Sequence, residues 1–147
     1  MGRTGGMVTR RADVSDAREI ARLFVELGHP ATEDDVRGRW TAWFAAGNVG
    51  IVVDGPEGEL LGAATLHQTI VLHRPKPIGR ISALVVDARH RNKGIGRAIV
   101  DAAEQMFRDE GCGTVEVTSN MRRTEAHAFY VRLGYELTSA RFVKPLA

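Results

Sequence analysis

The sequence predicts a single domain of the α/β (α+β) class, built on a mixed sheet with helices on both faces. Segments with helical periodicity alternate with short apolar segments that are bounded by turn residues, as strands are. Residues 83–86 are apolar without interruption, and such a strand needs cover on both faces of its sheet. At 147 residues the chain is long enough to bury a core.

Residues 7–11 are predicted to form the first strand, and two amphipathic helices follow it. Asp13 and Asp16 resemble a capping pair that opens the first helix, and Gly28 is among the residues that end it. Thr32 and Asp35 open the second helix in the same way. The two apolar faces consist of Ile20, Leu23, Phe24 and Leu27, and of Val36, Trp40, Trp43 and Phe44. Both tryptophans are therefore expected to pack the second helix rather than to line a pocket.

The middle of the chain is predicted to form three strands. Residues 48–53 and 60–72 read as a hairpin, because the turn sequence Asp-Gly-Pro-Glu-Gly lies between them. Residues 74–77 break the chain before the strand at 79–86, since they contain two prolines. This third strand leads directly into the most informative part of the sequence.

The last third is predicted to alternate between helices and strands. An amphipathic helix over residues 94–110 ends at two nearby glycines, and a strand follows at 114–118. A helix over residues 124–133 and a strand over 135–143 complete the chain. The predicted order is β-α-α-β-β-β-α-β-α-β, with one domain over residues 7–147 and a glycine-rich, disordered extension over 1–6.

The composition limits the classes of function. The formal net charge is only +2, so a basic surface, if there is one, must be local. A lone cysteine, Cys112, can form no internal disulfide, which favours a reducing, cytoplasmic location. The sequence contains no apolar run of about 18 residues and no charged-then-apolar leader at its start, so neither a membrane span nor a signal peptide is expected. No metal site is expected either.

Residues 91–98, Arg-Asn-Lys-Gly-Ile-Gly-Arg-Ala, lie between a predicted strand and a predicted helix. Two glycines let the backbone approach a ligand closely, and the helix start presents free N–H groups at the same place. Arg91, Lys93 and Arg97 add positive charge. This combination favours the binding of phosphate, although a purely structural turn is the alternative. The spacing matches neither the nucleoside-triphosphatase loop nor the dinucleotide fingerprint.

Two segments carry a resemblance to a known family. Val85-Val86-Asp87 followed by residues 90–98 closely resembles the acetyl-CoA-binding motif of the GNAT family of N-acetyltransferases. Residues 126–135, Ala-His-Ala-Phe-Tyr-Val-Arg-Leu-Gly-Tyr, are similar to the closing signature of that family. The resemblance spans residues 7–143 and implies a GNAT-like, mostly antiparallel twisted sheet. It also implies acetyl-CoA as co-substrate and an acyltransferase activity.

The resemblance further implies which residues hold acetyl-CoA. Backbone N–H groups of the loop would bind the pyrophosphate, and the preceding strand would splay from the strand near residues 118–120. Its free backbone groups would then pair with the amide-rich pantetheine as a further strand would. The residues implied are Leu84, Val85, Val86, Arg91, Asn92, Lys93, Gly94, Ile95, Gly96 and Arg97. Leu84 and Val86 are equally well explained as core residues.

Tyr130 matches the tyrosine that donates a proton to the departing CoA thiolate in the family. A phenol can do so because it is protonated at neutral pH. From the residues alone a core tyrosine is the simpler reading, because Ala126, Phe129, Tyr130 and Leu133 lie at helical spacing. Many members carry asparagine where this chain has Arg123. An asparagine does occur nearby, at Asn120, and could make the same contact, while Arg123 could reach a phosphate. Both are weaker candidates for contacts to acetyl-CoA.

The sequence says much less about the residues that bind and deprotonate the amine acceptor. Candidates for a general base by residue type are Glu26, His29, His67, His73 and Glu116, none of which is favoured. Cys112 has no paired histidine in view and is expected to be inert, so direct transfer within a ternary complex is expected. Residues that face the acceptor are expected in segments 28–32 and 67–77.

The leading hypothesis is an enzyme that transfers acetyl from acetyl-CoA to a primary amine of a small molecule or a peptide. A non-catalytic acyl-CoA-binding sensor is the main alternative, because no base can be identified. A nucleic-acid-binding module that uses the basic cluster at 89–97 is weaker, because no aromatic residues are interleaved for base stacking. The expected partners are thus acetyl-CoA and an amine, with no membrane, and a homodimer stays open.

Overall fold

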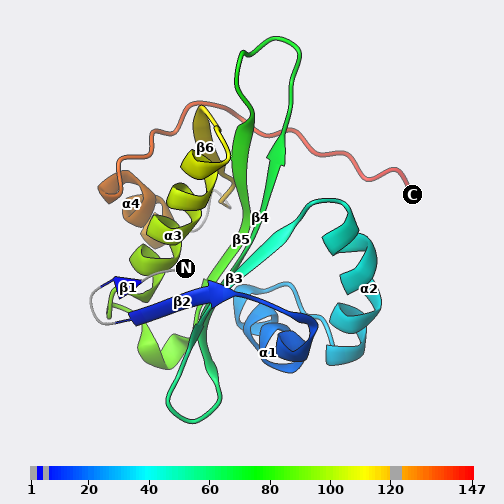
Figure 1. Cartoon of the computed structure of the whole chain (residues 1–147), viewed down its shortest axis with the longest axis vertical. Coiled ribbons are helices and arrows are strands. Elements are labelled where there is room, and N and C mark those ends of the chain that lie inside the picture. Colours follow the sequence, from blue (N-terminus) through cyan, green and yellow to red (C-terminus); the bar gives the residue numbers. More distant parts are fainter. Residues whose placement is uncertain (1–2, 5–6, 120–123) are drawn as a thin grey trace.

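A central sheet carries helices on both of its faces (Figure 1). This arrangement comes from a computed structural model, which describes residues 3–4, 7–119 and 124–147. The strands lie in the order β1-β2-β3-β4-β5-β6, and every neighbouring pair is antiparallel except β5 and β6, which are parallel. The predicted mixed, mostly antiparallel α/β fold is confirmed.

The strands are β1 (Arg3–Thr4), β2 (Met7–Arg11), β3 (Val49–Asp54), β4 (Leu60–Thr69), β5 (Ile78–Val86) and β6 (Thr114–Val117). The helices are α1 (Ala17–Leu27), α2 (Glu33–Ala45), α3 (Ile95–Asp109) and α4 (Thr124–Arg132), with short 3-10 turns at Val14–Asp16 and Ala88–His90. Within the described part of the chain, no helix is both long and apolar enough to cross a membrane.

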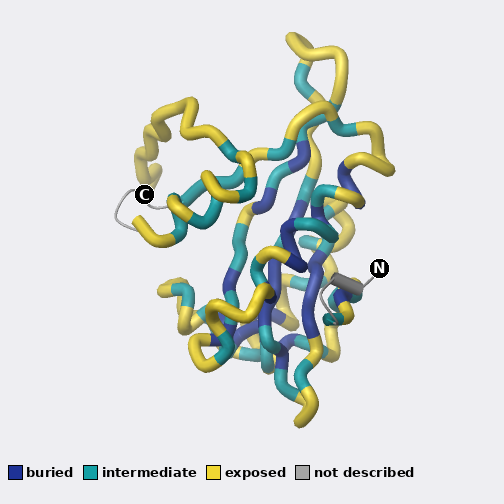
Figure 2. The backbone as a smooth tube through the Cα atoms, turned by 90° about the vertical axis from the view of Figure 1, so that its left-hand side faces the viewer, coloured by how far each residue is buried: buried dark blue, intermediate teal, exposed yellow. Residues whose placement is uncertain are grey.

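Alternation along the strands produces two cores, one on each face of the sheet. Ile51 and Ala64 contribute to the cluster that packs against α3, whereas Val52 and Ala63 contribute to the cluster under α1 and α2. Figure 2 shows this buried centre, with the exposed backbone at the loops and at the C-terminal segment. The sheet therefore lies between two layers of helices.

Both predicted helix starts are confirmed. Asp13 and Asp16 form a capping box, although it caps the 3-10 turn that precedes α1. Thr32 and Asp35 form the capping box of α2. The expected apolar face of α2 is only partly correct, because Phe44 is 60% exposed while Val36 is buried.

The predicted strand over residues 135–143 is wrong. Residues 136–147 are exposed and form no strand, with Phe142 at 94% exposure. A strand needs a neighbour to take up its backbone hydrogen bonds, and this segment has no strand partner among the residues that the structure describes.

The first residues also contribute to the sheet. Arg3–Thr4 form the two-residue strand β1, which pairs with Met7 and Val8 of β2. This strand lies within the segment expected to be disordered, and residues 1–2 and 5–6 lie outside the described residues. The domain boundary at residue 7 therefore stays a prediction.

Candidate functional site

The glycine loop leads into an open helix N-terminus. Gly94 takes the N-cap position of α3 in the left-handed conformation, with φ of 82°. Because glycine has no side chain, no side-chain hydrogen bond caps the first N–H groups of the helix. Asn92 also has a positive φ, 62°, so the chain reverses tightly just before the helix. The first N–H groups of α3 have no intrahelical acceptor by geometry, and the helix dipole makes their surroundings attractive to anions. Arg91, Lys93 and Arg97 are exposed around this terminus.

Helix α4 lies against the start of α3. A Cβ added to Gly96 would be 3.2 Å from Cζ of Phe129 and 3.5 Å from Cγ2 of Val86, so the two helices and β5 meet at this glycine. The ring of Tyr130, half-buried, lies 5.2 Å from that of Phe129, between ring centroids. The loop and the closing signature, represented here by Gly96 and Phe129, are thereby brought together although they are distant in the sequence.

Tyr135 attaches the end of α4 to α3. Its hydroxyl donates a hydrogen bond to Oε2 of Glu104 at 2.7 Å, and its ring lies 5.9 Å from that of Tyr130. Burial, followed by this hydrogen bond, raises the pKa of Tyr135 well above its ordinary value. Tyr135 thus keeps its proton and fixes the position of the helix that carries Tyr130.

Strand β5 loses its neighbour on one side. The parallel pairing of β5 with β6 runs from Ile78↔Thr114 to Ile81↔Val117, whereas β5 itself continues to Val86. The backbone groups that β5 directs toward β6 beyond residue 81 therefore have no ladder partner in the described sheet. The resemblance implied a splay in this stretch of β5, and the splay itself stays a prediction because residues 120–123 lie outside the described residues.

The predicted strand residues Leu84, Val85 and Val86 also serve the core. Leu84 and Val86 pack against the cluster on the α3 face, and Val85 is buried on the opposite face. Their side chains are therefore committed to packing. Any contact that these residues make with acetyl-CoA would fall to their backbone groups.

A β-bulge lies directly after the last residue of β5 that pairs with β6. Thr65 of β4 pairs with Ala83 and Leu66 pairs with Ile81, so Ser82 is the extra residue. The hydroxyls of Ser82 and Thr65 lie 2.8 Å apart, and Ser82 Oγ also donates to the carbonyl oxygen of Thr65 at 3.1 Å. The sequence did not single out either residue, because a bulge has no reliable side-chain signature.

Asp87 anchors the beginning of the glycine loop. Its carboxylate is fully buried and accepts from the backbone N–H and the guanidinium of Arg89, and from Nη1 of Arg22 at 2.9 Å. Arg22 also bonds Glu19, which accepts the backbone N–H of Leu60. Helix α1 is thus tied to the loop by charge-assisted hydrogen bonds, a role of Arg22 that sequence reasoning missed.

We expect Asp87→Asn to lower the free energy of unfolding by about 2 kcal/mol at pH 7, since charge-assisted hydrogen bonds would be lost from a buried group. The hydrogen bond from Arg89, ahead of that from Arg22, holds the Asp87 pKa well below its usual range despite burial. A depressed pKa stabilises the fold above the unfolded value of about 3.9, and this contribution fades as the pH falls below it. Urea unfolding between pH 7 and pH 3 should therefore show a penalty that shrinks below about pH 4.

Asp54→Asn is the matched control for Asp87→Asn. Asp54 also pairs with an arginine, at 2.6 Å from Nε of Arg10, but its side chain is 52% exposed. An exposed pair contributes less than about 1 kcal/mol. Equal penalties in the two variants, or an Asp87→Asn penalty that is unchanged at pH 3, would contradict the assignment.

The candidates for a general base lie in different places. His67, Arg80 and Glu116 are cross-strand neighbours on one face of the sheet, and Arg80 Nη1 lies 3.6 Å from Glu116 Oε1. Glu26 instead accepts the backbone N–H of Ala88 at 3.3 Å.

The other two candidates, His29 and His73, are exposed in loops. Cys112 follows α3, where its thiol contacts Oε1 of Gln68 and burial raises its pKa, as expected for an inert thiol. Asn120 and Arg123 lie outside the described residues.

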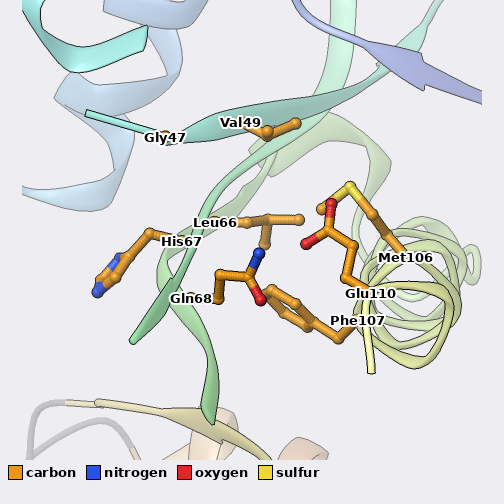
Figure 3. A pocket seen from close by; sticks show the side chains of 8 residues that line it. All are labelled: Gly47, Val49, Leu66, His67, Gln68, Met106, Phe107 and Glu110. Carbon is orange, nitrogen blue, oxygen red and sulfur yellow. The ribbon is translucent and has the colours of Figure 1, made fainter. Parts of the chain in front are cut away.

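A small cavity of about 50 Å³ lies beside the C-terminal part of α3 (Figure 3). Leu66, Met106, Phe107 and Glu110 are among its lining residues, and the imidazole of His67 points away from Met106 and Phe107. The cavity lies near the C-terminal end of α3, whereas Gly94 is at the N-terminus of that helix. The cavity therefore does not belong to the glycine-loop site.

A larger cavity of about 220 Å³ lies between α1, α2 and the sheet. Trp40 and Trp43 line it, with ring centroids 4.9 Å apart. Trp40 packs against the core cluster under α1 and α2, as expected, but the expectation that the two tryptophans do not line a pocket is wrong. Helix α2 stands off the sheet enough to leave this space.

Comparison with known proteins agrees with the geometry. Residues 15–135 match the acetyltransferase (GNAT) family. An aminoalkylphosphonate N-acetyltransferase of Salmonella typhimurium is 38% identical over 89 residues, which are 60% of this chain and 58% of that protein. An uncharacterized N-acetyltransferase of Bacillus subtilis is 37% identical over 67 residues, 45% of this chain and 47% of that protein. The chain thus matches about half the length of these curated relatives.

The solved structures agree on the fold. A crystal structure of a Trypanosoma brucei acetyltransferase superimposes with a TM-score of 0.83, covering 95% of this chain and 99% of that one at 24% identity. At this identity the likeness concerns the arrangement of helices and strands.

Proposed function

The chain belongs to the acetyltransferase (GNAT) family, and from this premise we propose that it transfers the acetyl group of acetyl-CoA to a primary amine of a small molecule or a peptide. The observation that carries the proposal is the open N-terminus of α3 at Gly94, together with the edge of β5 beyond Ile81, which has no ladder partner among the described residues. The first can bind a pyrophosphate, and the second can pair with an extended amide chain. Pyrophosphate and the amide-containing pantetheine are adjoining parts of CoA.

The proposed acetyl-CoA contacts follow from these two features. Backbone N–H groups from Arg91 to Arg97 would hold the pyrophosphate, and the exposed cations would neutralise its charge. The backbone from Leu84 to Val86 would pair with pantetheine. Family members use acetyl-CoA as co-substrate. The exposed cations around Gly94 support the proposal because their charge is opposite to that of the pyrophosphate.

The reaction is proposed to run directly within the ternary complex. The neutral amine attacks the thioester carbonyl, a C–N bond forms, and the C–S bond breaks as the tetrahedral intermediate collapses. Tyr130 donates its phenolic proton to the departing thiolate. The amine proton passes to water or to a base that is left unassigned, and the products are an amide and free CoA thiol.

Release of CoA thiol tests this function. Purified protein is mixed with acetyl-CoA and each member of a panel of amines, including 2-aminoethylphosphonate because of the Salmonella relative. We expect thiol release that depends on the amine and saturates with acetyl-CoA. Binding of acetyl-CoA without thiol release from any amine would instead favour the acyl-CoA sensor.

The cytoplasmic location stays a prediction from the single cysteine.

A further inference from the structure

The cavity between the sheet and the first two helices is walled mostly by apolar side chains. Its volume is about 220 Å³, and it lies on the side of the sheet where Figure 1 shows α1 and α2. The lining groups fall into three sets, from α1, α2 and the sheet. They include Phe24 of α1, Trp40 and Trp43 of α2, and Val52, Ala63 and Thr65 of the sheet.

The lining indicates the chemical class of the ligand. A cavity of about 150 Å³ lined by aliphatic and aromatic groups holds benzene, so this one has room for an aromatic ring with a short alkyl arm. Burying an ionic group against such walls would be costly. Arg39, the charged lining residue, is exposed at the rim, and its charge disfavours a ligand that carries a second ammonium group.

A polar point lies at the sheet end of the cavity. The hydroxyls of Thr65 and Ser82 lie 2.8 Å apart and either one can donate to the other. A hydroxyl oxygen has two lone pairs, so Oγ1 of Thr65 keeps at least one that can accept a hydrogen bond from an amine, whichever of the two donates. A ligand with an apolar body and an amino end would thus be matched at both ends.

This polar point adjoins the part of β5 that follows its pairing with β6. The lining residues Ala63, Ala64 and Thr65 pair with Val85, Leu84 and Ala83. Leu84 and Val85 are in the stretch of β5 proposed to contact pantetheine, and Ala83 directly precedes it. The pairing of β5 with β6 has already ended at Ile81. An amine held at Thr65 would therefore lie one strand away from the thioester.

We propose that this cavity is the acceptor site and that its substrate is a monoamine with an aromatic or branched aliphatic body, such as an arylalkylamine. The body fills the space beside Trp40 and Trp43, and the amino group lies at Thr65. The inference rests on the proposed acetyl transfer and adds the class of acceptor to it.

Intrinsic tryptophan fluorescence tests occupancy of the cavity without requiring catalysis. The chain has two tryptophans, and both line the cavity. Titration with 2-phenylethylamine in the presence of saturating CoA should change the fluorescence along a saturable curve, and 2-aminoethylphosphonate should not. Thiol release from acetyl-CoA is measured with the same two amines, and kcat/KM should be at least tenfold higher for 2-phenylethylamine.

A filled cavity gives the second arm of the test. Ala63 is 4% exposed and lines the cavity, so Ala63→Leu should occupy part of it. We expect KM for 2-phenylethylamine to rise at least tenfold, while KM for acetyl-CoA is unchanged. Ala42→Leu, on the exposed side of α2, is the control for the same chemical change. If Ala63→Leu does not fold, Ala63→Val makes a smaller change at the same position. The comparison of 2-phenylethylamine with 2-aminoethylphosphonate uses the unmodified protein and needs neither variant.

Each outcome has one meaning. A fluorescence change and turnover with 2-phenylethylamine, both weakened by Ala63→Leu, support the proposal. No saturable fluorescence change, or turnover of 2-aminoethylphosphonate in preference, overturns the acceptor class and leaves acetyl transfer intact. Thiol release from no amine at all contradicts the proposed function itself, and a fluorescence change would then show a ligand cavity that is not an acceptor site.

Discussion

Replacing Gly94 by glutamate is expected to weaken acetyl-CoA binding by about 100-fold or more, which corresponds to about 2.7 kcal/mol. Gly94 is the N-cap of α3, and its φ of 82° is one that a side chain tolerates poorly. The new carboxylate would lie at the helix N-terminus, where it would take the place of the pyrophosphate and repel it. Isothermal titration calorimetry with acetyl-CoA measures the loss directly.

Gly111→Glu separates the electrostatic effect from backbone strain. Gly111 has φ of 81° and follows the opposite end of α3, and an added Cβ would meet nothing within 4 Å there. At Gly94 the added Cβ would lie 3.3 Å from Cε of Met7, at the end of a flexible side chain. The two variants therefore introduce the same charge at nearly the same positive φ, at opposite ends of one helix. We expect Gly111→Glu to bind acetyl-CoA like the unmodified protein. Equal losses of affinity in the two variants, or full affinity in Gly94→Glu, would contradict the binding of the pyrophosphate at this helix terminus.

The helix starts and the glycine loop were predictable because their signals are local. Thr32 and Asp35 determine where α2 begins through hydrogen bonds that span three residues. Gly94 supplies a positive φ that few other residues adopt. Such features depend on neighbours in the sequence, so they can be read without knowing the fold.

The features that escaped prediction depend on distant partners. Ser82 becomes a bulge only because Thr65 and Leu66 of β4 pair on either side of it. Asp87 is bonded by Arg22, which lies 65 positions earlier on α1. Phe142 belongs to a segment that reads as a strand yet has no neighbouring strand in the described structure. In each case the deciding contact, or its absence, lies far away along the chain.

Replacing Tyr130 by phenylalanine is expected to lower kcat by about 10²-fold or more, which is the usual contribution of a positioned general acid. The ring and its contact with Phe129, at 5.2 Å between centroids, would be kept. Acetyl-CoA binding should therefore change little, and the loss should appear in kcat rather than in KM for acetyl-CoA. Steady-state thiol release with an amine that the protein accepts measures both constants.

Tyr135→Phe is the matched control, because it removes a second phenol from the same aromatic cluster, 5.9 Å away between ring centroids. Its hydroxyl bonds Glu104, so the variant should lose about 1 kcal/mol of stability while kcat stays within about twofold of the unmodified protein. An unchanged kcat in Tyr130→Phe would exclude Tyr130 as the donor. A large kcat loss in Tyr135→Phe alone would move the donor role to the second phenol. The two substitutions remove the same atom from two neighbouring rings, so any difference in kcat must come from where each hydroxyl points.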